Sequence, residues 1–364
     1  MRGLYVHIPF CKHICNYCDF TKRVPKNKDM IKEYLKHLKE ELATYSKYFD
    51  SVKTIYIGGG TPTMLDLDDL DNLLSMFKDF KDIYEYTIEI NPETLSEEKT
   101  DLIAKYGINR CSIGVESFNS DTLKVLGRKH NNKDVYKCIN MLKRRGINNI
   151  NIDLIFGTPG FDLSSINNEL KEFYKLDINH LSYYSLILEE NTIFYHQYKH
   201  NLFKPINNEL EANMYEFIIN DLEKNGFKQY EISNFSKNNT ESIHNKIYWQ
   251  NLEYIGIGLG ASGYLDGVRY TNNTVLDLYY KNYRKTEEKI DINAKFIEEM
   301  ILGLRMLKGV NIIDIKNKYD IDLLKDFEKL NYYLNNGFLM IDDNYIHLTK
   351  KGLLIANDIF EIFI

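Results

Sequence analysis

Short apolar runs alternate with amphipathic segments along the first half of the chain. Six such runs predict buried strands, over residues 4–10, 54–60, 85–92, 108–117, 150–160 and 180–188. Segments with apolar residues at helical spacing separate several of them, over 29–49, 96–107, 135–146 and 166–176. Parallel neighbouring strands need a long crossover, so this alternation predicts an α/β fold with a parallel sheet and helices outside.

A partial β/α barrel of six units is the predicted form of this sheet. In such barrels the chemistry lies at the carboxyl ends of the strands. Four motifs fall at predicted strand ends: "GGGTP" (58–62), "INPE" (90–93), "GVES" (114–117) and "GTPG" (157–160). We therefore predict that these four motifs share one site.

The strand and helix alternation breaks near residue 200, which predicts a core over 1–200 and further parts beyond it. Residues 201–294 form an extension with a helix over 207–226 and the segment "HNKIYW". Residues 295–364 predict a small domain in which helices precede a hairpin, the order of a winged helix. This domain has nine basic and eleven acidic residues, so DNA recognition is not expected.

Composition indicates an ordinary globular protein, with 44% hydrophobic and 27% charged residues and a net charge of −6. The chain has no apolar run of about 18 residues, so no membrane span is predicted. The start "MRGLYVHIPF" does not resemble a signal peptide. We therefore expect a cytosolic protein without a nucleic-acid partner. Cysteines stay reduced in the cytosol, where clustered thiols more often bind metal than form disulfides.

The stretch "PFCKHICNYCDF" places Cys11, Cys15 and Cys18 within eight residues of a chain with five cysteines. A zinc site would need a fourth ligand, for which His7 and His13 are close enough in sequence. An iron–sulfur cluster held by three thiolates leaves one iron open to a small molecule. The position after a first strand and the spacing C-x3-C-x2-C favour the cluster over zinc or a disulfide.

This spacing, with the aromatic Tyr17 before the third cysteine, resembles the signature of the radical S-adenosylmethionine (SAM) superfamily. The resemblance implies a [4Fe-4S] cluster on Cys11, Cys15 and Cys18. It also implies that the amino and carboxylate groups of SAM chelate the open iron. In that superfamily the cluster donates an electron and SAM yields a 5′-deoxyadenosyl radical. Three cysteines are then required, because a fourth ligand would close the iron.

The resemblance also assigns residues to SAM. Gly59, Gly60 and Thr61 of "GGGTP" match positions that hold the amino and carboxylate end of SAM, although the stretch is also compatible with an ordinary tight turn. The other matching positions at strand ends or near the cysteines are Tyr5, Tyr17, Glu89, Glu116, Arg128 and Asp153. Relatives more often have Gln at position 116. Each of these side chains alone is compatible with a salt bridge or a helix cap.

Motifs along the whole chain are similar to the family of oxygen-independent coproporphyrinogen III oxidase and its heme-chaperone paralogue. They include "YVHIPFC", "RCSIGVESF", "LGRKHN" and "DLIFGTPG". In that family the oxidase branch has a further cysteine two residues after the third, and an extension before the first strand. This chain has Phe20 at that position and begins at the first strand. The pattern therefore predicts the heme-chaperone branch.

The segment "HNKIYW" matches a motif that the chaperone branch is proposed to use for heme. The resemblance implies that His244 offers its imidazole to heme iron. Tyr248 and Trp249 are suited to stacking on a porphyrin face. The alternative is that His244 is a hydrogen-bonded core residue.

The resulting hypothesis is a heme chaperone that binds a [4Fe-4S] cluster, SAM and heme and transfers heme to an acceptor, such as a respiratory hemoprotein at the membrane. One alternative is an enzyme that catalyses the oxidative decarboxylation of coproporphyrinogen III to protoporphyrinogen IX. Another is an iron–sulfur module that senses redox state. Bound SAM would exclude the redox module, and the residue at position 20 separates the first two.

Overall fold

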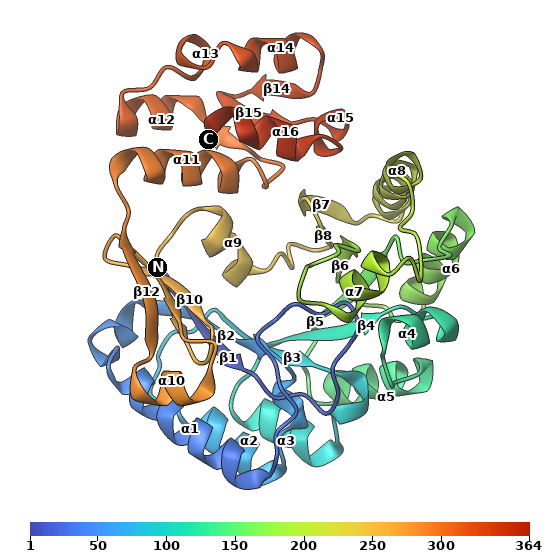
Figure 1. Cartoon of the computed structure of the whole chain (residues 1–364), viewed down its shortest axis with the longest axis vertical. Helices are drawn as coiled ribbons and strands as arrows, with labels where there is room; N and C mark the ends of the chain where they lie inside the picture. The colour runs from blue at the N-terminus through green and yellow to red at the C-terminus, as the bar shows by residue number, and fades with distance from the viewer.

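The computed structural model describes residues 1–364 and has six parallel strands in chain order at its centre, as predicted. Neighbouring strands in the sheet follow the order of the sequence from β1 to β6. Their bounds are β1 (Arg2–Ile8), β2 (Val52–Gly59), β3 (Glu85–Ile90), β4 (Arg110–Glu116), β5 (Asn149–Phe156) and β6 (His180–Ser185). The strands curve into a partial barrel, and Figure 1 shows helices along its outer side.

Six helices follow these strands on the outer side: α1 (Lys28–Ala43), α2 (Leu67–Ser75), α3 (Glu97–Lys105), α4 (Ser120–Leu126), α5 (Asn132–Arg144) and α6 (Leu163–Tyr174). Side-chain oxygens cap their amino ends, as Ser96 does by accepting a hydrogen bond from the Lys99 N–H. The sequence pattern did not predict α2 and α4. Both are short, with nine and seven residues, and α3, which has nine residues as well, was predicted with the help of its cap Ser96.

The two faces of the barrel strands differ in chemistry. On β1 the side chains of Leu4, Val6 and Ile8 are fully buried under the helices, whereas Tyr5 and His7 alternate with them and face inward. Later strands repeat this alternation. Their inward positions include Tyr56, Glu89, Ser112, Asp153 and Ser182. The barrel therefore has an apolar outer layer that holds the fold together and a polar interior.

The extension over 201–294 is continuous with the barrel, because its strands join the same twelve-stranded sheet at both edges. The strands β7 (Lys228–Glu231) and β8 (Asn234–Ser236) lie beside β6. The strands β9 (Tyr254–Ile257), β10 (Ser262–Leu265), β11 (Val268–Asn272) and β12 (Arg284–Lys289) continue outward from β1. Helix α7 (Ile193–Lys199) precedes the segment, and helices α8 (Asn208–Lys224), α9 (Ile243–Trp249) and α10 (Leu276–Lys281) complete it. The sheet stays open between β12 and β7.

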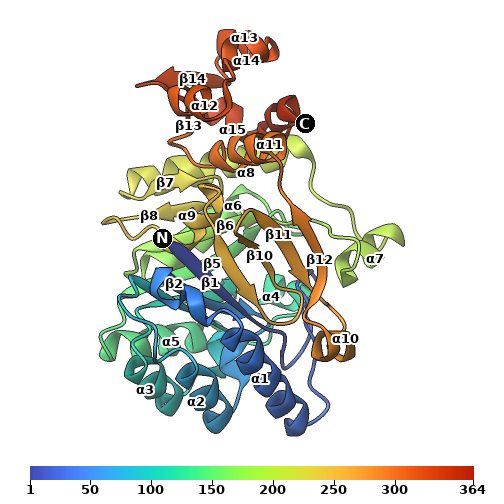
Figure 2. The ribbon, with the colours of Figure 1, turned by 90° about the vertical axis from the view of Figure 1, so that its left-hand side faces the viewer.

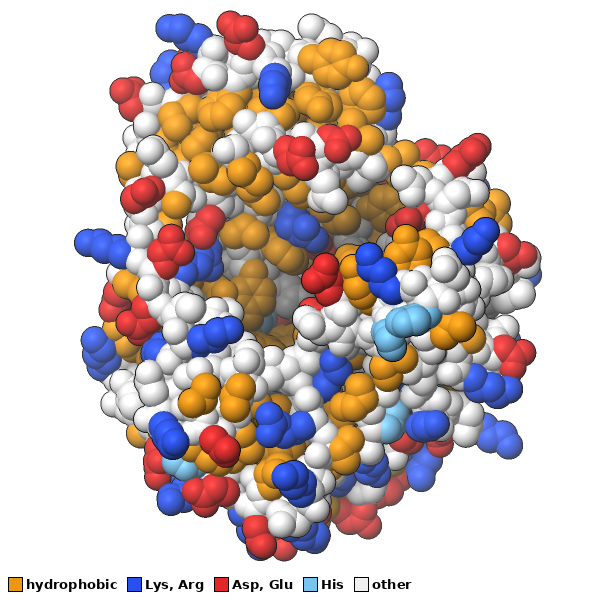
Figure 3. All heavy atoms as spheres, in the orientation of Figure 1, with side chains coloured by type: hydrophobic (Ala, Val, Ile, Leu, Met, Phe, Trp, Pro, Cys, Tyr) orange, Lys and Arg blue, Asp and Glu red, His pale blue; other side chains and the backbone are white.

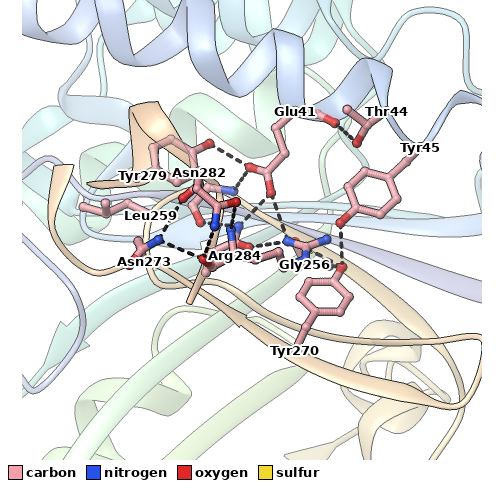
Figure 4. A network of polar contacts seen from close by, with 12 residues as sticks. Glu41, Thr44, Tyr45, Gly256, Leu259, Tyr270, Asn273, Tyr279, Asn282 and Arg284 are labelled. Atoms are coloured by element: carbon pink, nitrogen blue, oxygen red, sulfur yellow. Dashed lines mark hydrogen bonds and ion pairs between the residues drawn. The ribbon is translucent and has the colours of Figure 1, made fainter. Parts of the chain in front are cut away.

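A buried carboxylate on α1 ties the added strands to the barrel. Glu41 is 1% exposed and accepts hydrogen bonds from the Gly258 N–H at 2.8 Å, Asn272 Nδ2 at 2.7 Å and the Tyr279 hydroxyl at 2.7 Å. Arg284 on β12 lies 3.5 Å from the same carboxylate. Figure 4 shows the side chains of Tyr279 and Arg284 directed toward Glu41.

Residues 292–364 form a separate small unit at one end of the molecule (Figure 2). Its core is an antiparallel sheet of β13 (Val310–Asn311), β15 (Tyr345–Leu348) and β14 (Leu339–Asp342). Around it lie α11 (Ile292–Gly303), α12 (Ile312–Tyr319), α13 (Leu323–Asp326), α14 (Lys329–Asn335), α15 (Lys350–Leu353) and α16 (Ala356–Phe360). This order of helices and strands is that of a winged helix. None of the helices in the chain is both long and apolar enough to cross a bilayer.

Candidate functional site: a three-cysteine loop at the carboxyl ends of the barrel strands

The loop after β1 holds Cys11, Cys15 and Cys18 as free, half-buried thiols. Two backbone hydrogen bonds close the loop, from the Cys11 N–H to the Arg23 carbonyl at 2.9 Å and from the Arg23 N–H to the Pro9 carbonyl at 2.7 Å. In its middle, the Asn16 N–H donates to the Leu126 carbonyl at the end of α4. The loop is therefore fixed at both its base and its tip.

Burial raises the pKa of all three thiols, to about 11 for Cys18. Two neighbours oppose this effect by contacting sulfur. Thr61 Oγ1 lies 3.7 Å from Cys11 Sγ, and Arg128 Nη1 lies 3.8 Å from Cys15 Sγ. The thiols are therefore protonated at neutral pH, and binding a metal cluster releases their protons.

The histidines near the loop do not complete a site for one metal ion. His7 Nδ1 pairs with the Tyr5 hydroxyl at 2.9 Å, and its Nε2 pairs with the Thr21 carbonyl at 2.7 Å. Both nitrogens of His7 are thus engaged in holding the loop. No group of three His, Cys, Asp or Glu side chains in the chain is placed to hold a single metal ion.

Several buried polar atoms around the loop have no protein partner. They are His13 Nε2, both Glu93 carboxylate oxygens, Arg128 Nε and both His130 nitrogens. His130 Nδ1 lies 3.8 Å from Glu93, beyond hydrogen-bond distance. Buried polar groups in proteins are nearly always paired. Together with three free thiols, this set fits a site that receives polar groups from a cofactor.

The "GGGTP" turn passes close to the cysteine loop, and two of its glycines are required there. Gly59 has φ of +109°, and a Cβ on it would lie 2.5 Å from the His7 ring. A Cβ on Gly60 would lie 2.7 Å from the Phe10 carbonyl oxygen and 3.0 Å from Cys11 Sγ. The backbone of the turn can therefore approach the cysteine loop and a ligand beside it.

Glu89 faces this turn from the end of β3. Its carboxylate accepts hydrogen bonds from the Gly59 N–H at 2.9 Å and from the Tyr56 hydroxyl at 2.8 Å. Burial raises the pKa of Glu89 to about 7, which these two donors and the nearby Asp153 modify. Near neutral pH the carboxyl group can therefore exist in either protonation state.

Glu116 reaches the site through an irregular end of β4. The pairing of β4 with β5 shifts register between Gly114 and Glu116, and Glu116 adopts a left-handed φ of +66°. This conformation is unfavourable for a non-glycine residue and is often found at functional sites. Glu116 is 9% exposed and within hydrogen-bond reach of Tyr17. Burial raises the pKa of Glu116 to about 7, and the charge of Arg128 opposes the rise.

Asp153 lies on the inward face of β5. It accepts hydrogen bonds from the Ser112 hydroxyl at 2.8 Å and from Asn151 Nδ2 at 2.9 Å, and burial raises its pKa. The structure thus places the predicted SAM residues in the barrel interior, with Tyr5 and Asp153 on the inward faces of their strands and the others at or near the carboxyl ends. The residues of this region are Tyr5, Tyr17, Gly59, Gly60, Thr61, Glu89, Glu116, Arg128 and Asp153.

Asn91 is a residue of this site that the sequence pattern did not single out. Its Nδ2 donates to Thr61 Oγ1 at 3.1 Å, and its Oδ1 accepts from Arg128 Nη2 at 3.1 Å. It therefore connects the two side chains that contact Cys11 and Cys15. Its position in "INPE", directly after the strand, could have indicated a site residue, but an Asn there is equally typical of a turn.

His244 lies at the opposite end of the barrel from the cysteines. The ring is fully buried, with Nδ1 paired to the Thr54 hydroxyl and Nε2 to the Tyr248 hydroxyl, both at 2.7 Å. Glu85, at the start of β3, accepts the N–H of Ile243 at 2.9 Å and that of His244 at 2.8 Å. Neither ring nitrogen is free in this conformation. The assignment of His244 as a heme ligand therefore stays a prediction. It requires the ring to break its hydrogen bond to Thr54 or to Tyr248.

The profile of the radical SAM superfamily matches residues 5–173, and that of the HemN C-terminal domain matches residues 295–355. A solved structure with the same architecture is coproporphyrinogen III oxidase (HemN) from Escherichia coli. Its TM-score is 0.86 at 23% sequence identity, over 99% of this chain and 89% of that chain. The fold and the three-cysteine loop are thus those of a radical SAM protein.

Two relatives of similar length identify the family within the radical SAM proteins. The chain is 40% identical to the heme chaperone HemW of Lactococcus lactis subsp. lactis, over 100% of this chain and 97% of the relative. It is 38% identical to heme chaperone HemW of Bacillus subtilis, over 100% of this chain and 99% of the relative. The chain belongs to the HemW family of radical SAM proteins.

Proposed function

We propose that the chain is a cytosolic heme chaperone that binds a [4Fe-4S] cluster and SAM and passes heme to an acceptor protein, such as a respiratory hemoprotein at the membrane. The observation that carries this proposal is the full-length similarity to proteins named heme chaperone, at 40% identity. The three free thiols at the carboxyl ends of the barrel strands support the cluster. Phe20, 65% exposed in the same loop, provides no fourth thiol.

In this proposal Cys11, Cys15 and Cys18 hold the cluster, while the glycine turn and the inward polar side chains hold SAM. When bound, the two groups supply one-electron reduction of a sulfonium carbon–sulfur bond. Arg128 places a cation against Cys15, where it offsets the negative charge of cluster thiolates. Asn91 holds Arg128 and Thr61 in position. The tyrosines at 5 and 56 line the interior below this site.

Binding of SAM is expected to weaken as the pH falls from about 8 to about 6. The pKa of Glu89 and that of Glu116 both lie at about 7, raised by burial, so both carboxyl groups gain protons across this range. Ionised carboxylates attract the sulfonium cation and protonated ones do not. If binding requires one ionised carboxylate, affinity falls up to about tenfold per pH unit below 7.

Equilibrium dialysis of SAM against the anaerobically reconstituted protein measures this dependence. The double variant Glu89→Gln, Glu116→Gln is the control. Its affinity is expected to be low and to keep only the pH dependence of the SAM amino group, which must be deprotonated to bind iron. A wild-type affinity that stays constant over the range would show that neither carboxylate acts on SAM by its charge.

A heme titration of the cluster-reconstituted protein under anaerobic conditions tests the proposed function. We expect saturable binding at about one heme per chain, measured by the change in visible absorption. The same preparation is then offered coproporphyrinogen III and SAM, and no protoporphyrinogen is expected. Absence of saturable heme binding would overturn the chaperone proposal, and porphyrinogen turnover would favour the oxidase alternative.

The same titration tests His244. If the imidazole ligates heme iron, His244→Ala removes the imidazole signature from the heme spectrum, whereas Tyr248→Phe frees Nε2 and preserves it. If His244 only packs α9 against the barrel, His244→Ala lowers thermal stability and the spectrum of bound heme is unchanged. The two outcomes differ in the spectrum, so loss of stability alone cannot be mistaken for loss of a ligand.

A further inference from the structure

Arg305 connects three parts of the molecule. It follows α11 at the start of the C-terminal domain, and its guanidinium carbon lies 4.6 Å from the centre of the Trp249 ring in α9. Its backbone carbonyl accepts a hydrogen bond from the Ile232 N–H at 3.2 Å, in the turn between β7 and β8. Both Arg305 and Trp249 are half-buried. The pair therefore lies where the HNKIYW segment, the C-terminal domain and the β7 edge of the sheet meet.

The polar groups of this pair have no protein acceptors. Arg305 Nε and Trp249 Nε1 are both buried and both lack a partner. An acidic neighbour, Glu231, is 1% exposed and directs its carboxylate elsewhere, to the Ser233 N–H at 3.0 Å and to Asn234. Burial raises the pKa of Glu231, and the charge of Arg305 opposes the rise. The guanidinium therefore makes no hydrogen bond or ion pair within the chain, and it interacts with the Trp249 ring and, at longer range, with the charge of Glu231.

These donors define the chemistry of a ligand. A guanidinium and an indole N–H can only donate hydrogen bonds, so the ligand must supply acceptors. Arginine binds carboxylates in a planar, two-pronged geometry. The guanidinium of Arg305 covers one face of the Trp249 ring, so a flat aromatic group can stack only on the opposite face. A porphyrin with propionate groups combines both properties, whereas an inorganic anion has only the first.

The surroundings are open and partly apolar. Figure 1 shows α9 across the gap between the two edges of the sheet, and Figure 3 shows the surface hollowed between the C-terminal domain and the barrel. A groove of about 280 Å³ lies between α9, α11 and the strands β9 and β11, and neither Arg305 nor Trp249 lines it. Its apolar lining includes Tyr248, Leu252 and Ile301. Apolar surface is therefore available between α9 and α11, beside the elements that carry the pair.

We propose that Arg305 and Trp249 form a carboxylate-binding site that receives a propionate group of heme, with the C-terminal domain supplying the cation and the HNKIYW segment the aromatic face. The proposal rests on the proposed heme-chaperone function and adds the C-terminal domain to its heme site. It also gives a role to Arg305, whose half-buried charge at the contact between the two parts of the chain is otherwise unpaired.

Comparison of heme with heme dimethyl ester, whose propionates are blocked, tests this site. Arg305→Ala is expected to weaken heme binding about tenfold, the effect of losing one charge-assisted hydrogen bond. The same variant is expected to leave the affinity for the dimethyl ester unchanged. Arg305→Lys keeps the charge without the planar fork, so its heme affinity should lie between those of wild type and Arg305→Ala.

Lys308→Ala is the matched control, because it removes a positive charge three residues away that lies over Tyr345. It should change neither affinity, and thermal melting verifies that each variant is folded. Equal effects of Arg305→Ala on heme and on the ester, or no effect on either, would overturn the propionate site. A wild-type protein that binds neither ligand would instead overturn the proposed function, and the site with it.

Discussion

Replacing Cys11, Cys15 or Cys18 with alanine is expected to abolish the [4Fe-4S] cluster. Each thiol supplies one of three protein ligands, and the other groups near the loop do not offer a substitute thiolate. His7 is occupied at both nitrogens. After anaerobic reconstitution, the iron and sulfide content of each variant should fall to background, and the broad charge-transfer absorption of the cluster should disappear.

The two remaining cysteines provide matched controls. Cys111 on β4 and Cys138 on α5 are fully buried in the apolar layer outside the barrel, and burial raises the pKa of both thiols. Cys111→Ala and Cys138→Ala should lose some stability through the small cavity but retain the iron of the wild type. Iron content unchanged in any of the three loop variants would contradict the cluster assignment. Zinc in its place would support the zinc alternative.

Replacing Glu41 with alanine is expected to lower the free energy of unfolding by about 3–5 kcal/mol. The substitution leaves the Gly258 N–H, Asn272 Nδ2 and the Tyr279 hydroxyl without their common acceptor in a fully buried position. It also removes the carboxylate that faces Arg284 (Figure 4). The added strands β9–β12 should therefore detach from α1 more readily. Urea denaturation followed by circular dichroism measures the change.

Glu40→Ala is the control for this prediction, since Glu40 is the preceding residue of α1 and is exposed. Its loss should cost less than about 0.5 kcal/mol, as is usual for surface positions. Glu41→Gln keeps the side-chain shape and one acceptor, so we expect an intermediate loss. If Glu41→Ala were as mild as Glu40→Ala, the network would not hold the added strands.

Much of the barrel was predictable because its information is local. An apolar run at a strand and a cap such as Ser96 act within a few residues, and all six predicted strands are found. The cysteine loop was equally accessible, since its three thiols lie within eight residues of sequence. The short helices α2 and α4 were not predicted, whereas α3, as short as α2, was predicted together with its cap Ser96.

The extension was less predictable because its contacts are distant in sequence. The parallel pairing of β9 with β1 joins residues about 250 positions apart, such as Gly3 and Tyr254. Glu41 lies on the apolar stripe of α1, but its hydrogen-bond donors come from the segment of β9 to β12 and cannot be read from the helix itself. Asn91 likewise gains its role only when Thr61 and Arg128 reach it from other strands.

The sequence by itself determined the α/β class, the six-strand order and the three-cysteine loop, because periodicity, caps and ligand spacing are properties of neighbouring residues. Only the tertiary structure decided which side chains meet. It gathered the polar residues of five strands beside the cysteines. It buried His244 at the opposite end of the barrel, and it brought Arg305 against Trp249. Those contacts depend on strand pairing and domain packing, which no short stretch of sequence encodes.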